Sequence, residues 1–163
     1  MRDASIALSP YLLSQASPGV SEDAREIERE VSRAQGFVDN VAAYETPRQE
    51  TVQEIERVFA ECSADSWDGH GAAAIDPRSY KHAVRFVLRL PPRTARGEIT
   101  AEPDGEISVE WHRSPQKFLI VSVGKDRELT YTWRVGDERA WGVRRFEDEI
   151  PSEILECLGR VTR

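Results

Sequence analysis

The chain has 163 residues, of which 39% are hydrophobic and 31% are charged, and its net charge is −7. These values are typical of a folded domain and argue against a disordered segment, and a chain of this length can bury a substantial core. General nucleic-acid binding is not expected, because affinity for the phosphate backbone depends on a cationic surface.

The apolar runs and the cysteines indicate the compartment. Residues 5–13 are apolar but interrupted by Pro10, and they do not have the form of a secretory signal. No apolar run approaches the ~20 residues needed to cross a membrane. Cys62 and Cys157 lie in apolar helical contexts, which predicts two reduced and mostly buried thiols. We therefore expect a cytoplasmic protein with no membrane partner.

The N-terminal part of the chain predicts a tail followed by an acidic helical hairpin. Residues 1–20 contain Pro10, Pro18 and Gly19, which is typical of a flexible tail. Residues 21–63 carry 11 Asp and Glu against 5 Arg, so most of the net charge lies in the predicted hairpin.

Two amphipathic helices are expected within this hairpin. Ser21 suits the N-cap of the first, and Thr46 with Pro47 suits the start of the second. Apolar residues of the first helix follow at spacings of three and four and form an a/d seam of about two heptads: Ile27, Val31, Ala34, Val38 and Val41. We expect this seam to pack on the second helix or on the sheet, or otherwise to bind a protein partner or a second copy of the chain.

Residues 64–163 predict an α+β domain. After a loop, a helix begins at Asp76-Pro77 and stops before Pro91, and a last short helix follows Pro151. Between these helices, short connections join segments with strand patterns (107–112, 117–123, 129–135 and 140–146). The second segment is apolar at nearly every position, which predicts a strand covered on both faces. The whole pattern predicts an antiparallel meander of four to five strands with helices packed on one side.

The loop before the first of these helices supplies one candidate site. Its sequence Trp67-Asp68-Gly69-His70-Gly71-Ala72 sets a carboxylate and an imidazole among glycines. Loops between rigid elements often carry binding and catalytic residues, so Asp68 and His70 are a candidate acid–base pair. The competing interpretation is structural, with Trp67 filling the core and Asp68-Gly69 forming a turn.

Polar rows on two predicted strands supply a second candidate. Glu110 and His112 are two residues apart on one strand and therefore share a face. Thr130, Thr132 and Arg134 form a similar row on another strand. If the rows lie on one side of the sheet, they form a candidate ligand-binding face, and the alternative is the solvated side of an ordinary antiparallel sheet.

The helix after Asp76 carries a third candidate, a basic stripe. Arg78, Lys81, Arg85 and Arg89 follow at spacings of three and four, which places them on one face. Such a stripe can contact a phosphate backbone or an acidic partner. It can equally face solvent or the acidic helices of the same chain.

Familiar catalytic and metal-binding motifs are not found in the sequence. It has no phosphate-binding glycine loop, no dinucleotide-binding glycine pattern and no nucleophile elbow. Three histidines and two widely separated cysteines do not make a zinc set. We therefore assign no catalytic residue and expect neither a metal nor a cofactor.

The loop at residues 67–72 also carries a resemblance. Together with the Leu90-Pro91 pair and the strand Gly105-Glu106-Ile107-Ser108-Val109-Glu110-Trp111, it resembles a family of small uncharacterised bacterial proteins with a Trp-Asp-Gly-aromatic-Gly-Ala loop. The likeness covers residues 55–160, and His70 stands where the family usually has an aromatic residue. The resemblance implies a bacterial origin and a domain of this extent, and it implies no activity.

Three functions are compatible with these patterns. The first is a non-enzymatic interaction protein, such as a small accessory, inhibitor or antitoxin-like protein, that binds a partner or itself through the amphipathic helices. The second is a small-molecule or enzymatic site that combines Asp68 and His70 with Glu110 and His112. The third, less expected because of the acidic balance, is nucleic-acid contact through the basic stripe.

Overall fold

The computed structural model describes residues 47–147 and 149–163. The predicted tail and first helix lie outside these residues. Predictions about the seam residues Ile27, Val31, Val38 and Val41 therefore stay predictions.

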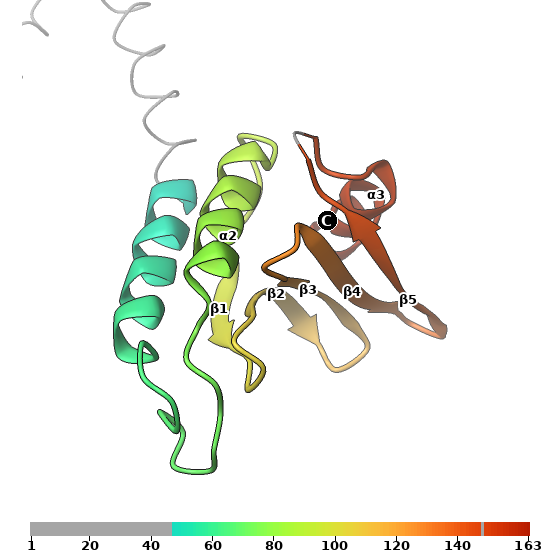
Figure 1. The fold of residues 1–163 in the computed structure, drawn as a ribbon. Coiled ribbons are helices and arrows are strands. Elements are labelled where there is room, and N and C mark those ends of the chain that lie inside the picture. Colours follow the sequence, from blue (N-terminus) through green and yellow to red (C-terminus); the bar gives the residue numbers. More distant parts are fainter. Residues whose placement is uncertain (1–46, 148) are drawn as a thin grey trace, which may run out of the picture. The chain divides into compact units, whose positions relative to one another are not determined.

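The described chain is built from three helices and a five-stranded sheet (Figure 1). A helix over residues 47–61 comes first. It is followed by α2 (Pro77–Arg89), β1 (Glu98–Ala101), β2 (Ile107–Ser114), β3 (Lys117–Val123), β4 (Glu128–Val135), β5 (Glu138–Arg145) and α3 (Ser152–Thr162). The predicted α+β class is confirmed.

Local chemistry explains where α2 begins and ends. The carboxylate of Asp76 accepts a hydrogen bond from the backbone N–H of Arg78 at 2.8 Å, and Pro77 occupies the first turn, where no helical N–H is needed. The helix ends at Arg89, because Leu90 precedes Pro91 and a residue before a proline disfavours helical dihedrals. One face of α2 is buried through Ala83, Phe86 and Val87.

The sheet is an antiparallel meander in which every strand pairs with its sequence neighbours, in the order β1-β2-β3-β4-β5. This confirms the predicted topology, with five strands. The β4–β5 connection is the two-residue turn Gly136-Asp137, and Gly136 adopts a φ of 64°, which glycine reaches without steric cost.

The strand register gives the sheet one apolar face. Residues paired directly across strands share a face, and the pairs that join Val109, Val121 and Tyr131 form one apolar row. The helices cover this face, and Phe86 of α2 meets Phe146 edge to face at 5.9 Å between ring centroids. The largest fully buried side chains are Phe86, Phe146, Ile55, Ile107, Leu119, Leu129, Ile154, Val87, Val109, Val121, Val123 and Val161.

The helix over residues 47–61 shares this core. Ile55 and Val58 are buried in it, and the ring of Phe59 stacks on Tyr80 of α2 at 4.4 Å. Figure 1 shows this helix lying beside α2. Cys62, just after the helix, is buried, as is Cys157 of α3, and neither forms a disulfide. Burial raises the pKa of both thiols, so they stay protonated.

The opposite face of the sheet is only partly covered by the described residues. Strand β3 alternates between fully buried residues and residues such as Phe118 and Ile120, which are half-buried. The prediction that this strand is covered on both faces was therefore wrong for the described structure. We call this second side of the sheet the open face.

Within the described residues, none of the helices combines the length and the apolar character that crossing a membrane requires.

Candidate functional site

The glycine-rich loop is closed by its own polar groups. Asp68 Oδ1 accepts hydrogen bonds from the backbone N–H of His70 at 2.7 Å and of Ala72 at 3.1 Å. These bonds lower the pKa of the Asp68 carboxyl, because they stabilise its ionised form. The Trp67 indole donates to the carbonyl of Ala73 at 3.0 Å while its ring packs against the core. The Asp68 carboxylate is thus bonded to backbone amides.

The loop is attached to the β1–β2 turn. Ala73 N–H donates to Pro103 O at 2.9 Å, and Asp76 N–H donates to Gly105 O at 3.0 Å. Glu110 is five residues beyond Gly105 along β2, which corresponds to about 16 Å at ~3.3 Å per residue. The structure therefore does not bring the Asp68/His70 pair and the Glu110/His112 pair into one site.

Glu110 and His112 do interact with each other on the open face. His112 Nε2 lies 2.8 Å from Glu110 Oε2, and the imidazole stacks on Phe118 with 5.6 Å between ring centroids. The two residues border an open hollow of about 200 Å³ whose lining also includes Arg96, Glu98 and Arg113.

Arg134 lies on the same face, two strands away from His112. The register pairs His112 with Phe118 and Phe118 with Arg134, so the three side chains form one row across β2, β3 and β4. Arg134 Nε donates to Gly136 O at 2.9 Å, which holds the guanidinium near the β4–β5 turn.

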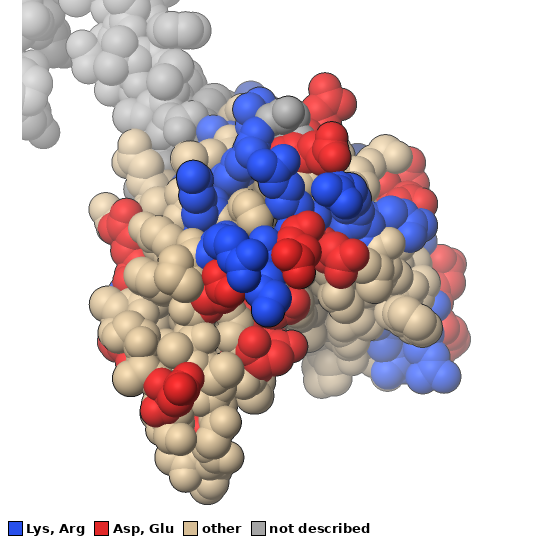
Figure 2. All heavy atoms as spheres, in the orientation of Figure 1, with Lys and Arg blue, Asp and Glu red and all other residues tan. Residues whose placement is uncertain are grey.

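The basic stripe of α2 lies on a surface of mixed charge. Arg78 pairs with Asp76 at 3.0 Å, and Lys81 and Arg89 are exposed, whereas Arg85 is half-buried. Figure 2 shows Lys and Arg gathered over α2 with acidic side chains among them. Basic residues of the stripe therefore have acidic neighbours on the same face, and no purely cationic surface results.

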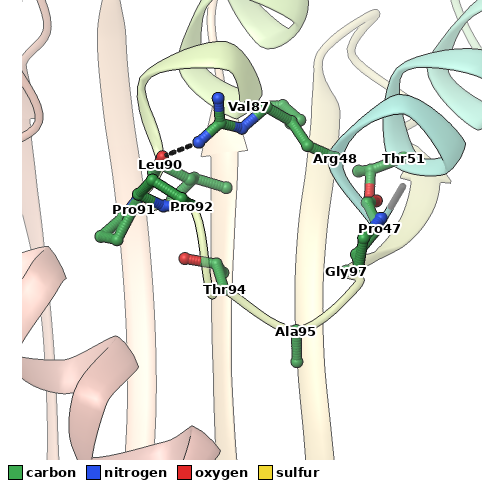
Figure 3. A pocket seen from close by; sticks show the side chains of 10 residues that line it. All are labelled: Pro47, Arg48, Thr51, Val87, Leu90, Pro91, Pro92, Thr94, Ala95 and Gly97. Carbon is green, nitrogen blue, oxygen red and sulfur yellow. Dashed lines mark hydrogen bonds between the residues drawn. The ribbon is translucent and has the colours of Figure 1, made fainter. Parts of the chain in front are cut away.

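A small cavity separates the helix over residues 47–61 from the loop after α2 (Figure 3). Arg48 spans it, and its guanidinium donates to Leu90 O at 2.7 Å, which satisfies a carbonyl at the end of α2. The cavity has a volume of about 10 Å³, room for no more than one water molecule. We assign it a structural role.

A pair of exposed apolar side chains on β5, Trp141 and Val143, was not predicted from the sequence. Trp141 is 78% exposed and Val143 is 44% exposed. The register pairs Trp141 with Thr132 and Val143 with Thr130, and Thr132 pairs in turn with Ile120, so both side chains lie on the open face. The predicted meander already placed this strand at an edge of the sheet, but the sequence did not show that the face carrying Trp141 and Val143 is exposed.

Two side chains on the helix side of β5 pair with α3. Arg144 pairs with Glu153 at 2.6 Å, and Glu138 pairs with Arg160 at 2.6 Å. These two exposed ion pairs link β5 to α3. The alternate side chains of β5 lie on the other side of the sheet, away from α3.

No group of three or more potential metal ligands occurs among the residues that the structure describes. No protein-family model matches the chain, and no curated protein and no solved structure is significantly similar to it. The resemblance based on the Trp67–Ala72 loop stays a prediction.

Proposed function

We propose that this chain is a non-enzymatic protein-interaction module that binds its partner through the open face of the sheet at β5. The observation that carries the proposal is Trp141, which is 78% exposed beside the 44% exposed Val143. Exposed aromatic side chains next to aliphatic ones are typical anchors of protein interfaces, because binding removes a large apolar surface area from contact with water.

The surroundings of Trp141 support an interface. Its cross-strand neighbour Thr132 is exposed, and the half-buried Ile120 lies one strand further along the same row. Arginines flank the row, with Arg134 on β4 and Arg139 on β5. An apolar centre with a polar rim is the usual anatomy of a protein interface, and arginine is enriched there.

A photo-crosslinking residue at position 132 tests this proposal in the cells that produce the protein. Thr132 is directly opposite Trp141, so a partner bound there is within reach of the probe. The matched control places the same probe at Glu56, which is exposed on the helix over residues 47–61.

We expect a discrete crosslinked species from position 132 that is lost in the Trp141→Ser variant and is not formed from position 56. An unchanged crosslinking pattern in Trp141→Ser would contradict the proposal, as would no specific product from position 132. A product of twice the chain mass that depends on Trp141 would identify a second copy as the partner.

A further inference from the structure

The hydrogen-bond pattern of β5 determines which of its backbone groups face outward. In an antiparallel pair, residues directly opposite each other alternate between hydrogen-bonded and non-hydrogen-bonded pairs. Phe146 N–H donates to Arg127 O at 2.7 Å, so the pair formed by these two residues is of the hydrogen-bonded type. Counting back along the register, the next such pairs lie at Arg144, Gly142, Ala140 and Glu138 of β5.

The remaining residues of β5 therefore direct both backbone N–H and C=O away from β4. These outward residues are Arg139, Trp141, Val143 and Arg145. No described strand pairs with this side of β5, which is the last strand of the sheet, at the right in Figure 1. An unpaired strand edge is a template for another extended segment.

The same four residues also share a side of the sheet. Successive side chains of a strand alternate between faces, so these four all lie on the open face. The outward backbone groups of β5 and the exposed side chains of Trp141 and Val143 thus belong to one surface. Of these groups, the carbonyl of Val143 accepts a hydrogen bond from Arg144 Nη1 at 2.8 Å, which an added strand would replace. We call these four residues the β5 edge.

The charge of the β5 edge indicates what binds there. Arg139 is directly opposite Arg134 in a non-hydrogen-bonded pair, where Cα atoms are only about 4.5 Å apart. Like charges in this position destabilise a sheet. Among the described residues, Arg145 of the edge pairs with Glu147 at 3.2 Å, and both of these side chains are largely exposed. A carboxylate placed beside Arg139 would reduce the repulsion.

We propose that the β5 edge binds an extended acidic segment of a protein partner as a sixth strand, paired antiparallel to β5 like every other neighbour in the sheet. Its side chains opposite Arg139, Trp141, Val143 and Arg145 would alternate along the segment as acid, apolar, apolar and acid, each two residues apart. This inference rests on the proposed interaction function and specifies its partner. A second copy of this chain fits less well, because full overlap of two β5 edges places Arg139 opposite Arg145 twice.

The probe is the synthetic peptide Glu-Thr-Val-Thr-Val-Thr-Glu, added in millimolar excess to the full chain. Residue-resolved amide hydrogen exchange by NMR is the measurement. Binding as a strand would protect the outward amides of Trp141 and Val143, which have no partner on β4. The amides of Ala140 and Gly142 already donate to β4 and serve as internal controls.

Two peptide variants separate strand addition from other modes of binding. N-methylation of the first valine removes an N–H that would point at β5, so we expect protection of Trp141 and Val143 to be lost. N-methylation of the central threonine removes an N–H that would point away, so we expect binding to be retained. A peptide with lysines in place of both glutamates should bind about tenfold more weakly.

Substitutions in the protein, rather than in the peptide, test the same surface. Val143→Pro removes an outward N–H without breaking a bond to β4, which edge strands tolerate. We expect Val143→Pro and Arg139→Glu each to weaken peptide binding about tenfold while both variants unfold at nearly the wild-type temperature. If Val143→Pro destabilises the β4–β5 hairpin, Arg139→Glu still tests whether the β5 edge binds the peptide.

Four results would overturn the inference. The first two are a lack of protection at Trp141 and Val143 when the peptide is added, and equal binding of the lysine peptide and the acidic peptide. The third is protection of these amides in the absence of peptide that increases with protein concentration. The fourth is a stronger perturbation of these amides by a single-stranded oligonucleotide than by the acidic peptide. If crosslinking from position 132 still depends on Trp141, the interaction function stands and only strand addition fails.

Discussion

The contact between the glycine-rich loop and the β1–β2 turn makes a quantitative prediction about Gly105. This residue has a φ of 84°, and a Cβ added to it would lie 2.7 Å from the carbonyl oxygen of Ala74. That carbonyl cannot easily withdraw, since the neighbouring Ala73 and Asp76 are hydrogen-bonded to the turn. Gly105→Ala therefore combines backbone strain with a collision between two backbone segments.

The expected magnitude follows from a matched control. Gly69 has a similar φ of 74° and nothing within 4 Å of an added Cβ, so Gly69→Ala measures the backbone strain alone. That strain is about 1–2 kcal/mol for an L-residue. Displacing the Ala74 carbonyl adds a further cost, and we expect about 3 kcal/mol in total for Gly105→Ala.

Equilibrium unfolding in urea, followed by tryptophan fluorescence, measures both variants against the wild type. The prediction is that Gly105→Ala lowers the free energy of unfolding by about 1–2 kcal/mol more than Gly69→Ala does. Equal losses in the two variants would refute the argument that the loop and the turn are in close backbone contact.

Two further predictions concern the core and the pH dependence of stability. Phe86→Ala should lower the free energy of unfolding by about 3–5 kcal/mol, and Leu88→Ala, which changes a 53% exposed residue on the same helix, by less than about 0.5 kcal/mol. Similar losses would contradict the assigned face of α2. Burial, with a smaller contribution from nearby carboxylates, raises the pKa of Glu106 above its ordinary value of 4.5. The stability that this carboxyl contributes is therefore present at low pH and is lost as the pH rises through the higher pKa of the folded state. Glu106→Gln should therefore raise the melting temperature at pH 7 and not at pH 4, and an equal gain from Glu56→Gln would show that only the net charge matters.

The sequence predicted those parts of the fold that depend on local chemistry. Asp76 and Pro77 start α2 by capping and by a fixed φ, and Gly136 makes the β4–β5 turn because it reaches a positive φ. Alternating residues in β2 and β4 revealed the strands and their buried face. Strand β1 has only four residues, too few for a periodic pattern to identify, and it accounts for the fifth strand.

The candidate site was harder to predict, because it depends on which segments become neighbours. Glu110 and His112 share a face by strand geometry alone, and they are hydrogen-bonded. Asp68 and His70 lie on a loop that packs against the opposite end of β2. Nothing in the local sequence shows how far this loop lies from Glu110 and His112. Trp141 has the same alternating context as a buried residue, and only the packing of the helices on the other face shows that it is exposed.

Amide hydrogen exchange of the full chain alone shows whether the outward amides of β5 are unpaired, which the binding of a sixth strand requires. We predict an alternating pattern, with fast exchange at Trp141 and Val143 and slow exchange at Ala140 and Gly142, at every protein concentration. Slow exchange at all four amides would contradict it, since the edge of β5 would then already be paired.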